Sequence, residues 1–244
     1  MVDRLCYNVR EQTVCEADNE HAVRFVSVDV KGVWRVGMIA EIYHKVRSFS
    51  EDELTGNFFG MMRYFPFSRG LRRVFLKAVK SEDVRVKRVL NEIIEDDFEF
   101  EFWKRSEKGL GEIDGLIRVG KVGIGIEVKY CSGLSGEEQL EREAAMLEEW
   151  CMGEQKLLLL IATEEEAGNI YLQNYQKKAF ENVYLGYLTW QDILLALDEV
   201  VTETIYEERI LEDLKLLLTG KGFISFQGFV IKIPVEKGLF YEFG

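Results

Sequence analysis

The sequence contains few of the residues that build several common kinds of site. Among 244 residues it has four cysteines and two histidines, and no two cysteines form a CxxC pair. A structural zinc site and a disulfide framework are therefore not expected. With only His21 and His44 present, a histidine-based triad is also poorly supported. Any chemistry should come mainly from carboxylates and amines.

Long apolar runs and targeting signals are absent as well. No apolar run has the length needed to span a bilayer, and the first residues lack the basic-then-apolar pattern of a secretory signal. We therefore expect a cytoplasmic protein with no membrane partner, and the sequence leaves a homodimer open. Because 47% of the residues are hydrophobic, the chain can bury a sizeable core.

Hydrophobic periodicity predicts alternating helices and strands. Residues 50–65 and 71–95 have helical spacing, the latter in two pieces that restart near Ser81. Three strands follow at 98–104, 112–119 and 122–130, then a helix at about 135–151 and a continuous apolar strand at 156–162. This order predicts an α/β sandwich with a mixed central sheet, an antiparallel meander first and crossover-connected strands after it.

Three regions are expected along the chain. Residues 1–45 form a β-rich extension with a hairpin in 22–36 that turns at Lys31-Gly32, residues 46–205 form the core, and residues 206–244 add a helix and an extended tail that pack on it.

Charge is unevenly distributed. The net charge of −12 by itself argues against a nucleic-acid partner. Between positions 63 and 88, however, the sequence has nine basic residues and only two acidic ones. This segment could hold phosphates locally, or it could be an ordinary solvated helical face. The candidate phosphate-binding residues are Arg63, Arg69, Arg72, Arg73 and Lys77.

A two-residue turn at Gly120-Lys121 sets the register of the central hairpin. Opposed residue numbers then sum to 241, which places Asp114 across from Glu127 and Glu112 across from Lys129. Two opposed carboxylates repel each other unless a cation neutralises them. Together with a main-chain carbonyl, such oxygens suit Mg²⁺ or Mn²⁺. Gly123 and Gly125 should leave this face open to a phosphate. The alternative is a solvated hairpin with a Glu112–Lys129 ion pair.

Asp114 followed by Glu127-Val128-Lys129 on the next strand resembles the PD-(D/E)XK nuclease superfamily, whose restriction-endonuclease-like core has a similar order of elements. The resemblance implies that Asp114, Glu127 and the Val128 carbonyl hold Mg²⁺ and that Lys129 positions the attacking water. It further assigns catalytic roles to Glu53, from the preceding helix, and Gln139, from the following one. The sequence departs from the family pattern at two positions. Ile113 precedes Asp114 where the family usually has proline, and Glu143 stands where the exonuclease branch has tyrosine.

These residues imply a Mg²⁺-dependent (endo)deoxyribonuclease that acts on DNA. Two of these residues have alternative interpretations. Glu53 could form a capping box with Ser50, and Gln139 could be an ordinary exposed residue of its helix. The alternative function is a catalytically inactive nucleic-acid-binding or assembly module. A small-molecule-binding domain ranks lower because no glycine-rich phosphate loop follows a strand. The four tryptophans are expected to pack in the core or at an interface.

Overall fold

The computed structural model describes residues 51–130 and 138–223, together with three short strands near the N-terminus. These strands are β1 (Thr13–Val14), β2 (Val26–Val28) and β3 (Trp34–Val36). They form an antiparallel sheet in the order β1-β2-β3. The predicted hairpin within 22–36 corresponds to the β2–β3 pair. Its turn at Lys31-Gly32 and the boundary between positions 45 and 46 lie outside the described residues.

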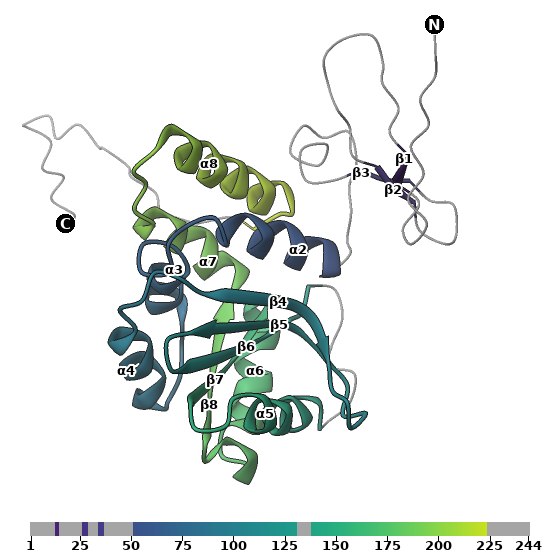
Figure 1. Ribbon diagram of the computed structural model, residues 1–244, viewed down its shortest axis with the longest axis vertical. Helices are drawn as coiled ribbons and strands as arrows, with labels where there is room; N and C mark the ends of the chain where they lie inside the picture. The colour runs from purple at the N-terminus through teal and green to yellow at the C-terminus, as the bar shows by residue number, and fades with distance from the viewer. Residues whose placement is uncertain (1–12, 15–25, 29–33, 37–50, 131–137, 224–244) are drawn as a thin grey trace, which may run out of the picture.

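A five-stranded mixed sheet forms the centre of the molecule (Figure 1). In spatial order its strands are β4 (Glu99–Arg105), β5 (Glu112–Val119), β6 (Val122–Val128), β7 (Gln155–Ala162) and β8 (Val183–Thr189). The first three are antiparallel and the last two run parallel to β6. The predicted meander followed by crossovers is therefore confirmed, and so is the α/β class.

One face of the sheet carries most of the helices. These are α2 (Glu51–Met62), α3 (Leu71–Ala78), α4 (Val84–Glu92), α7 (Trp190–Ala196) and α8 (Ile205–Gly220), with the 3-10 turn η2 (Leu197–Glu199). Their apolar residues and the β6 side chains Ile124, Ile126 and Val128 form one buried cluster. Burying this much apolar surface is the main stabilising term of the fold.

The other face is covered by α5 (Gln139–Trp150), α6 (Glu164–Asn174) and the 3-10 turn η1 (Lys178–Phe180). A second, smaller cluster lies here, with Leu116, Leu147 and Leu158 among its members. Because helices cover both faces, every residue of β6 is buried. This explains why β6 and β7 have nearly continuous apolar sequences and little alternation.

The helix predictions agree with the structure with small shifts at the ends. The helix expected at 71–95 is divided into α3 and α4, and Lys80 between them bridges to Tyr187 of β8. Asp83 caps α4 by accepting a hydrogen bond from the Arg85 N–H, 2.9 Å away. The first residues of the helix expected at about 135–151 lie outside the described residues, and α5 begins at Gln139. No helix within the described ranges is both long and apolar enough to cross a membrane.

Candidate active site

The β5–β6 hairpin has the predicted register. Its paired residues run from Gly115↔Ile126 to Val119↔Val122, with numbers that sum to 241. Gly120 has a φ of 56°, whereas Lys121 does not have a positive φ, which fits a type II′ turn. Counted from the turn, the regular pairing ends at Gly115, so Asp114 is the first residue of β5 that lies beyond it. Asp114 and Glu127 are thus neighbours at the end of the ladder, but they are not a paired position within it.

Asp114 is held by the backbone of the neighbouring strand. Its Oδ2 accepts a hydrogen bond from the Val128 N–H at 2.7 Å. This contact fixes one carboxylate oxygen beside β6 and leaves the half-buried side chain next to Glu127. The N–H and C=O of one strand residue point to the same edge of the strand, so the Val128 carbonyl lies on the edge facing Asp114.

Lys129 and Gln139 both contact Glu127. The Lys129 Nζ lies 2.6 Å from Glu127 Oε1, and the Gln139 Nε2 donates to the same oxygen at 2.5 Å. Glu127 is 2% exposed and Lys129 is 6% exposed. Gln139 is therefore a buried residue of the site, which rules out an exposed helix position. The alternative Glu112–Lys129 pair is also wrong, because Glu112 pairs with Arg105.

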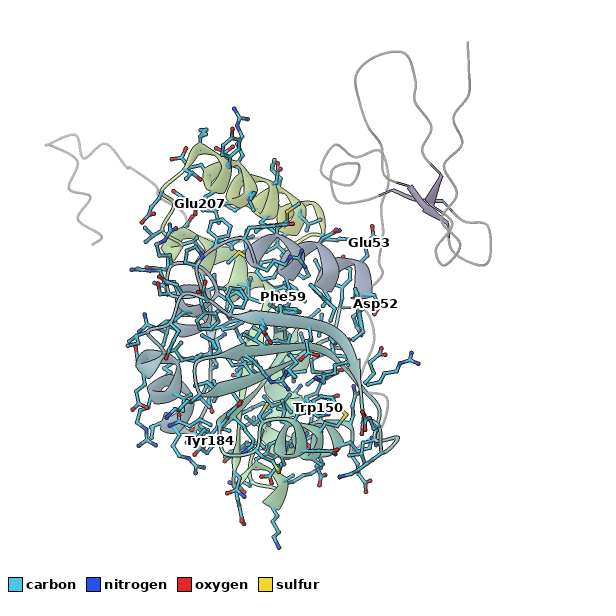
Figure 2. The ribbon with its side chains drawn as sticks, viewed as in Figure 1. Asp52, Glu53, Phe59, Trp150, Tyr184 and Glu207 are labelled. Carbon is cyan, nitrogen blue, oxygen red and sulfur yellow. The ribbon has the colours of Figure 1, made fainter. Side chains whose placement is uncertain are left out.

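The preceding helix contributes Glu51, and the prediction of Glu53 is corrected. Glu51 Oε1 lies 3.2 Å from Lys129 Nζ, and its Oε2 accepts the Tyr130 N–H at 2.9 Å. Each residue advances about 100° around an α-helix, so Glu51 and Glu53, two residues apart, lie on nearly opposite faces of α2. Figure 2 shows Asp52 and Glu53 in the first turn of α2, the same turn that brings Glu51 to Lys129.

Glu143, which was not predicted as a site residue, also belongs to the site. It is 1% exposed, and both Gln139 and Glu127 lie close enough to its carboxyl group to shift the pKa of Glu143. Glu127 and Asp114 are close enough for their charges to act on it. Gln139 and Glu143 are four residues apart on α5, so they share one helix face. That spacing from a predicted site residue was the signal in the sequence.

Burial and mutual repulsion shift the pKa values of these groups. Burial, followed by the charge of Glu127, raises the pKa of Asp114 to about 8. Burial also raises the pKa of Glu127, although Lys129 opposes this effect. Burial and the charge of Glu127 raise the pKa of Glu143 well above its usual value. Burial would lower the pKa of Lys129, but the charges of Glu127, Glu51 and Asp114 outweigh it, so that pKa is raised.

The face beside the site is covered, contrary to the expectation that Gly123 and Gly125 leave it open. A Cβ at Gly123 would lie 2.3 Å from the Cys151 Sγ. A Cβ at Gly125 would lie 2.7 Å from Ile113 Cδ1 and 2.8 Å from Leu147 Cδ1. The two glycines therefore allow α5 to pack closely on β6. Ile113 belongs to this second cluster and does not join the apolar face on which strict alternation would place it.

Two candidates of the basic segment, Arg69 and Arg72, have partners outside the carboxylate cluster. Arg69 bonds to Glu207 and to the Val201 carbonyl. In Figure 2, Glu207 lies on the opposite side of the molecule from Asp52 and Glu53. The Arg72 guanidinium donates to the carbonyls of Leu90 and Asn91 near the end of α4. Phosphate binding by these residues stays a prediction.

The remaining basic candidates have different surroundings. Lys77 pairs with Glu199 at 2.9 Å. Arg63 is exposed, and its guanidinium lies 5.3 Å from the centre of the Tyr64 ring. Arg73 is exposed on α3. None of these positions brings a cation to Asp114 or Glu127.

The donor set suits a hard divalent cation. Asp114, Glu127 and the Val128 carbonyl offer oxygen ligands of the kind that Mg²⁺ and Mn²⁺ prefer. The charges of Asp114, Glu127 and Glu143 repel one another, so added positive charge would relieve the repulsion. Within the described residues, no group of three or more His, Cys, Asp or Glu side chains is already gathered around a metal position.

Comparison with known proteins gives no further assignment. No family model matches the chain, and neither a curated protein nor a solved structure matches it. The function has to be argued from the site itself.

Proposed function

We propose that this chain is a metal-dependent nuclease of the PD-(D/E)XK type that hydrolyses phosphodiester bonds in DNA. One observation carries the proposal. Asp114, Glu127 and Lys129 meet at the ends of two neighbouring strands, with Lys129 Nζ 2.6 Å from Glu127 Oε1. Opposed carboxylates beside a buried lysine are costly for stability, and catalysis gives a reason to keep them.

The proposed reaction adds water across the phosphodiester. A bond forms between the water oxygen and phosphorus, the bond to the leaving sugar oxygen breaks, the water releases a proton and the leaving oxygen takes one up. Asp114, Glu127 and the Val128 carbonyl would hold Mg²⁺ or Mn²⁺, which supplies a Lewis acid and lowers the pKa of bound water. Lys129 stabilises negative charge and orients the water. Gln139 and Glu51 hold Glu127 and Lys129 in position.

The second candidate is a catalytically inactive nucleic-acid-binding or assembly module. Its supporting observation is that Glu127 is 2% exposed and already accepts contacts from both Lys129 and Gln139. The composition, with four cysteines and no CxxC pair, fits a cytoplasmic location for either function.

Cleavage of plasmid and single-stranded DNA in Mg²⁺ and in Mn²⁺ tests the proposal. We expect Asp114→Ala and Lys129→Ala to abolish cleavage, and circular dichroism checks that both variants are folded at the assay temperature. Cleavage that persists in both variants, or no cleavage by the wild type with either metal, would rule out the nuclease. DNA binding without cleavage, unchanged by chelation of metal, would support the inactive module.

Glu51 and Glu53 provide a matched pair for the same assay. Glu51→Gln should lower kcat/KM by about 10- to 100-fold, as loss of a supporting contact to a metal site typically does. Glu53→Gln removes an identical charge from the same helical turn but not from Lys129, so it should leave kcat/KM within about twofold. Equal effects of the two substitutions would show that Glu51 acts only through the overall charge of the helix.

A further inference from the structure

Trp103 has the one unusual backbone conformation of the described residues outside glycine. Its φ is 49°, whereas the other positive φ angles in those ranges belong to glycines. A bulky residue in this region is strained, and the strain persists only where the surrounding structure enforces it. Such strain is concentrated at functional sites, so the position of Trp103 relative to the carboxylates is informative.

The pairing of β4 with β5 places Trp103 opposite Asp114. Phe102 pairs with Gly115 and Lys104 pairs with Ile113, and the intervening pair, Trp103 with Asp114, is missing from the ladder. The irregularity therefore affects both strands at the same level of the sheet. It also explains why Ile113 points to the α5 face. The strained tryptophan and the proposed metal ligand share one interruption in the sheet.

This interruption turns the Trp103 side chain toward α2. A Cβ at Gly56 of α2 would lie 3.5 Å from Cη2 of the indole, an ordinary van der Waals distance, so the ring lies against this part of α2. The Phe102 ring lies beside the indole, with centroids 5.1 Å apart and planes at 34°. Even so, Trp103 is 39% exposed. An aromatic ring is thus supported on one side, open to solvent on another, and located between Asp114 and the helix that carries Glu51.

Within the described residues, three cations of β4 and β5 pair with carboxylates of the same strands. Lys104 and Arg118 both contact Glu101, and Arg105 contacts Glu112. Duplex DNA is bound largely through phosphate neutralisation by free lysines and arginines. An aromatic platform instead binds unpaired bases through stacking, which needs fewer cations and accepts any base. The surroundings of Trp103 favour the second mode.

We propose that Trp103 stacks on a nucleobase next to the scissile phosphate, so that the substrate is single-stranded DNA or DNA with an unpaired base at the site. This inference rests on the proposed nuclease function and specifies its substrate class. Trp103 acts as a positioning residue. It holds the base, and the strand then brings its phosphate to Asp114, Glu127 and Lys129.

The test measures binding of a fluorescently labelled single-stranded oligodeoxynucleotide, and of the same sequence as a duplex, in the absence of divalent metal. Trp103→Leu keeps an apolar side chain against Phe102 and Gly56 but removes the aromatic face. It should weaken single-strand binding by about 5- to 100-fold, the range expected for loss of one stacked base. Trp103→Phe keeps a smaller ring and should lose less. Duplex binding should change by less than about twofold in both variants.

Tyr206→Leu is the matched control, because Tyr206 is an exposed aromatic residue on α8. It should bind both oligonucleotides like the wild type. The inference is overturned if the wild type does not bind the single strand, if Trp103→Leu binds it as the wild type does, or if single-strand and duplex binding fall equally. An equal loss in Tyr206→Leu would also overturn it.

The cleavage assay separates this inference from the nuclease proposal. If DNA cleavage depends on Asp114 and Lys129 but single-strand binding does not depend on Trp103, only the stacking role fails. If Trp103 controls single-strand binding but the wild type cleaves nothing, the nuclease fails and the stacking surface remains.

Discussion

At the residue scale, the site is a cluster of buried carboxylates around one lysine. Lys129 pairs with Glu127 and Glu51, while Asp114 has a backbone N–H as its partner. Protein interiors usually avoid unbalanced charge, because each ionised group loses its hydration on burial. Without metal, part of this cluster is therefore expected to hold protons at neutral pH.

The raised pKa of Asp114, about 8, predicts how the stability of the metal-free protein depends on pH. An unfolded aspartate titrates near 4, so between these values the folded state binds the proton more tightly. The stabilising contribution is complete below about pH 4 and is lost as pH rises through about 8. The thermal unfolding temperature in a chelator should thus fall between pH 6 and pH 9.

Asp114→Asn should reduce this fall, because the amide has no proton to lose. Some decrease should remain, since the pKa values of Glu127 and Glu143 are raised as well. Added Mg²⁺ or Mn²⁺ should raise the wild-type unfolding temperature more at pH 8.5 than at pH 6. A wild-type stability that is flat over this range, or that rises with pH, would contradict the assignment of a protonated Asp114.

The sequence identified most of the site but chose the wrong glutamate on α2. Glu53 fits a capping-box spacing from Ser50, which is a local criterion. Glu51 is instead three and four residues before Leu54 and Thr55, which are both buried, and so it lies on the stripe of α2 that faces the sheet. Helical periodicity could have shown that Glu51 faces inward. It could not have shown that Lys129 is the partner, since that depends on how α2 docks.

At the element scale, the position of α5 depends on two glycines of β6. Leu147 of α5 and Leu158 of β7 occupy the space that a Gly125 side chain would need. Gln139 and Glu143 come from this same helix, so close packing of α5 also sets their distance from Glu127. The order of strands and their register followed from periodicity and the Gly120 turn. The role of Gly123 and Gly125 in the packing of α5 could not be predicted in the same way. Glycine is found both on a sheet face that is open to a ligand and on one that a helix covers closely.

Gly125→Ala tests this packing. The new Cβ would lie 2.7 Å from Ile113 Cδ1 and 2.8 Å from Leu147 Cδ1, and both residues are fully buried. We expect a loss of about 1–3 kcal/mol in the free energy of unfolding, as for other overpacked cores. Denaturant unfolding measures this loss. A shift of α5 should also lower kcat/KM for DNA.

Gly60→Ala is the control, since a Cβ at Gly60 of α2 has no neighbour within 4 Å among the described residues. Alanine is the better helix former, so this change should stabilise the protein by about 0.4–1 kcal/mol. If both glycine variants had the same stability, α5 would not depend on close packing at Gly125.

At the scale of the whole molecule, the positive charge of the basic segment is not gathered at the carboxylate site. The chain carries a net charge of −12, and two cations of its basic segment, Arg69 and Arg72, are held by Glu207 and by the carbonyls of Leu90 and Asn91. Composition revealed the cluster of cations but not its location, because the turn after α2 carries α3 and α4 away from the carboxylates (Figure 1). An acidic protein whose described cations near the site are paired with carboxylates should bind DNA with little help from counterion release.

The salt dependence of binding follows from this charge distribution. Neutralising six to ten phosphates costs about 10³- to 10⁵-fold in affinity between 50 and 200 mM salt. With one to three phosphate contacts, single-strand affinity should fall by about tenfold or less over that range. Fluorescence anisotropy at several salt concentrations measures the slope. Arg73→Glu, an exposed change on α3, should leave the slope unaltered. A steep slope that this variant reduces would show that the basic segment holds the substrate.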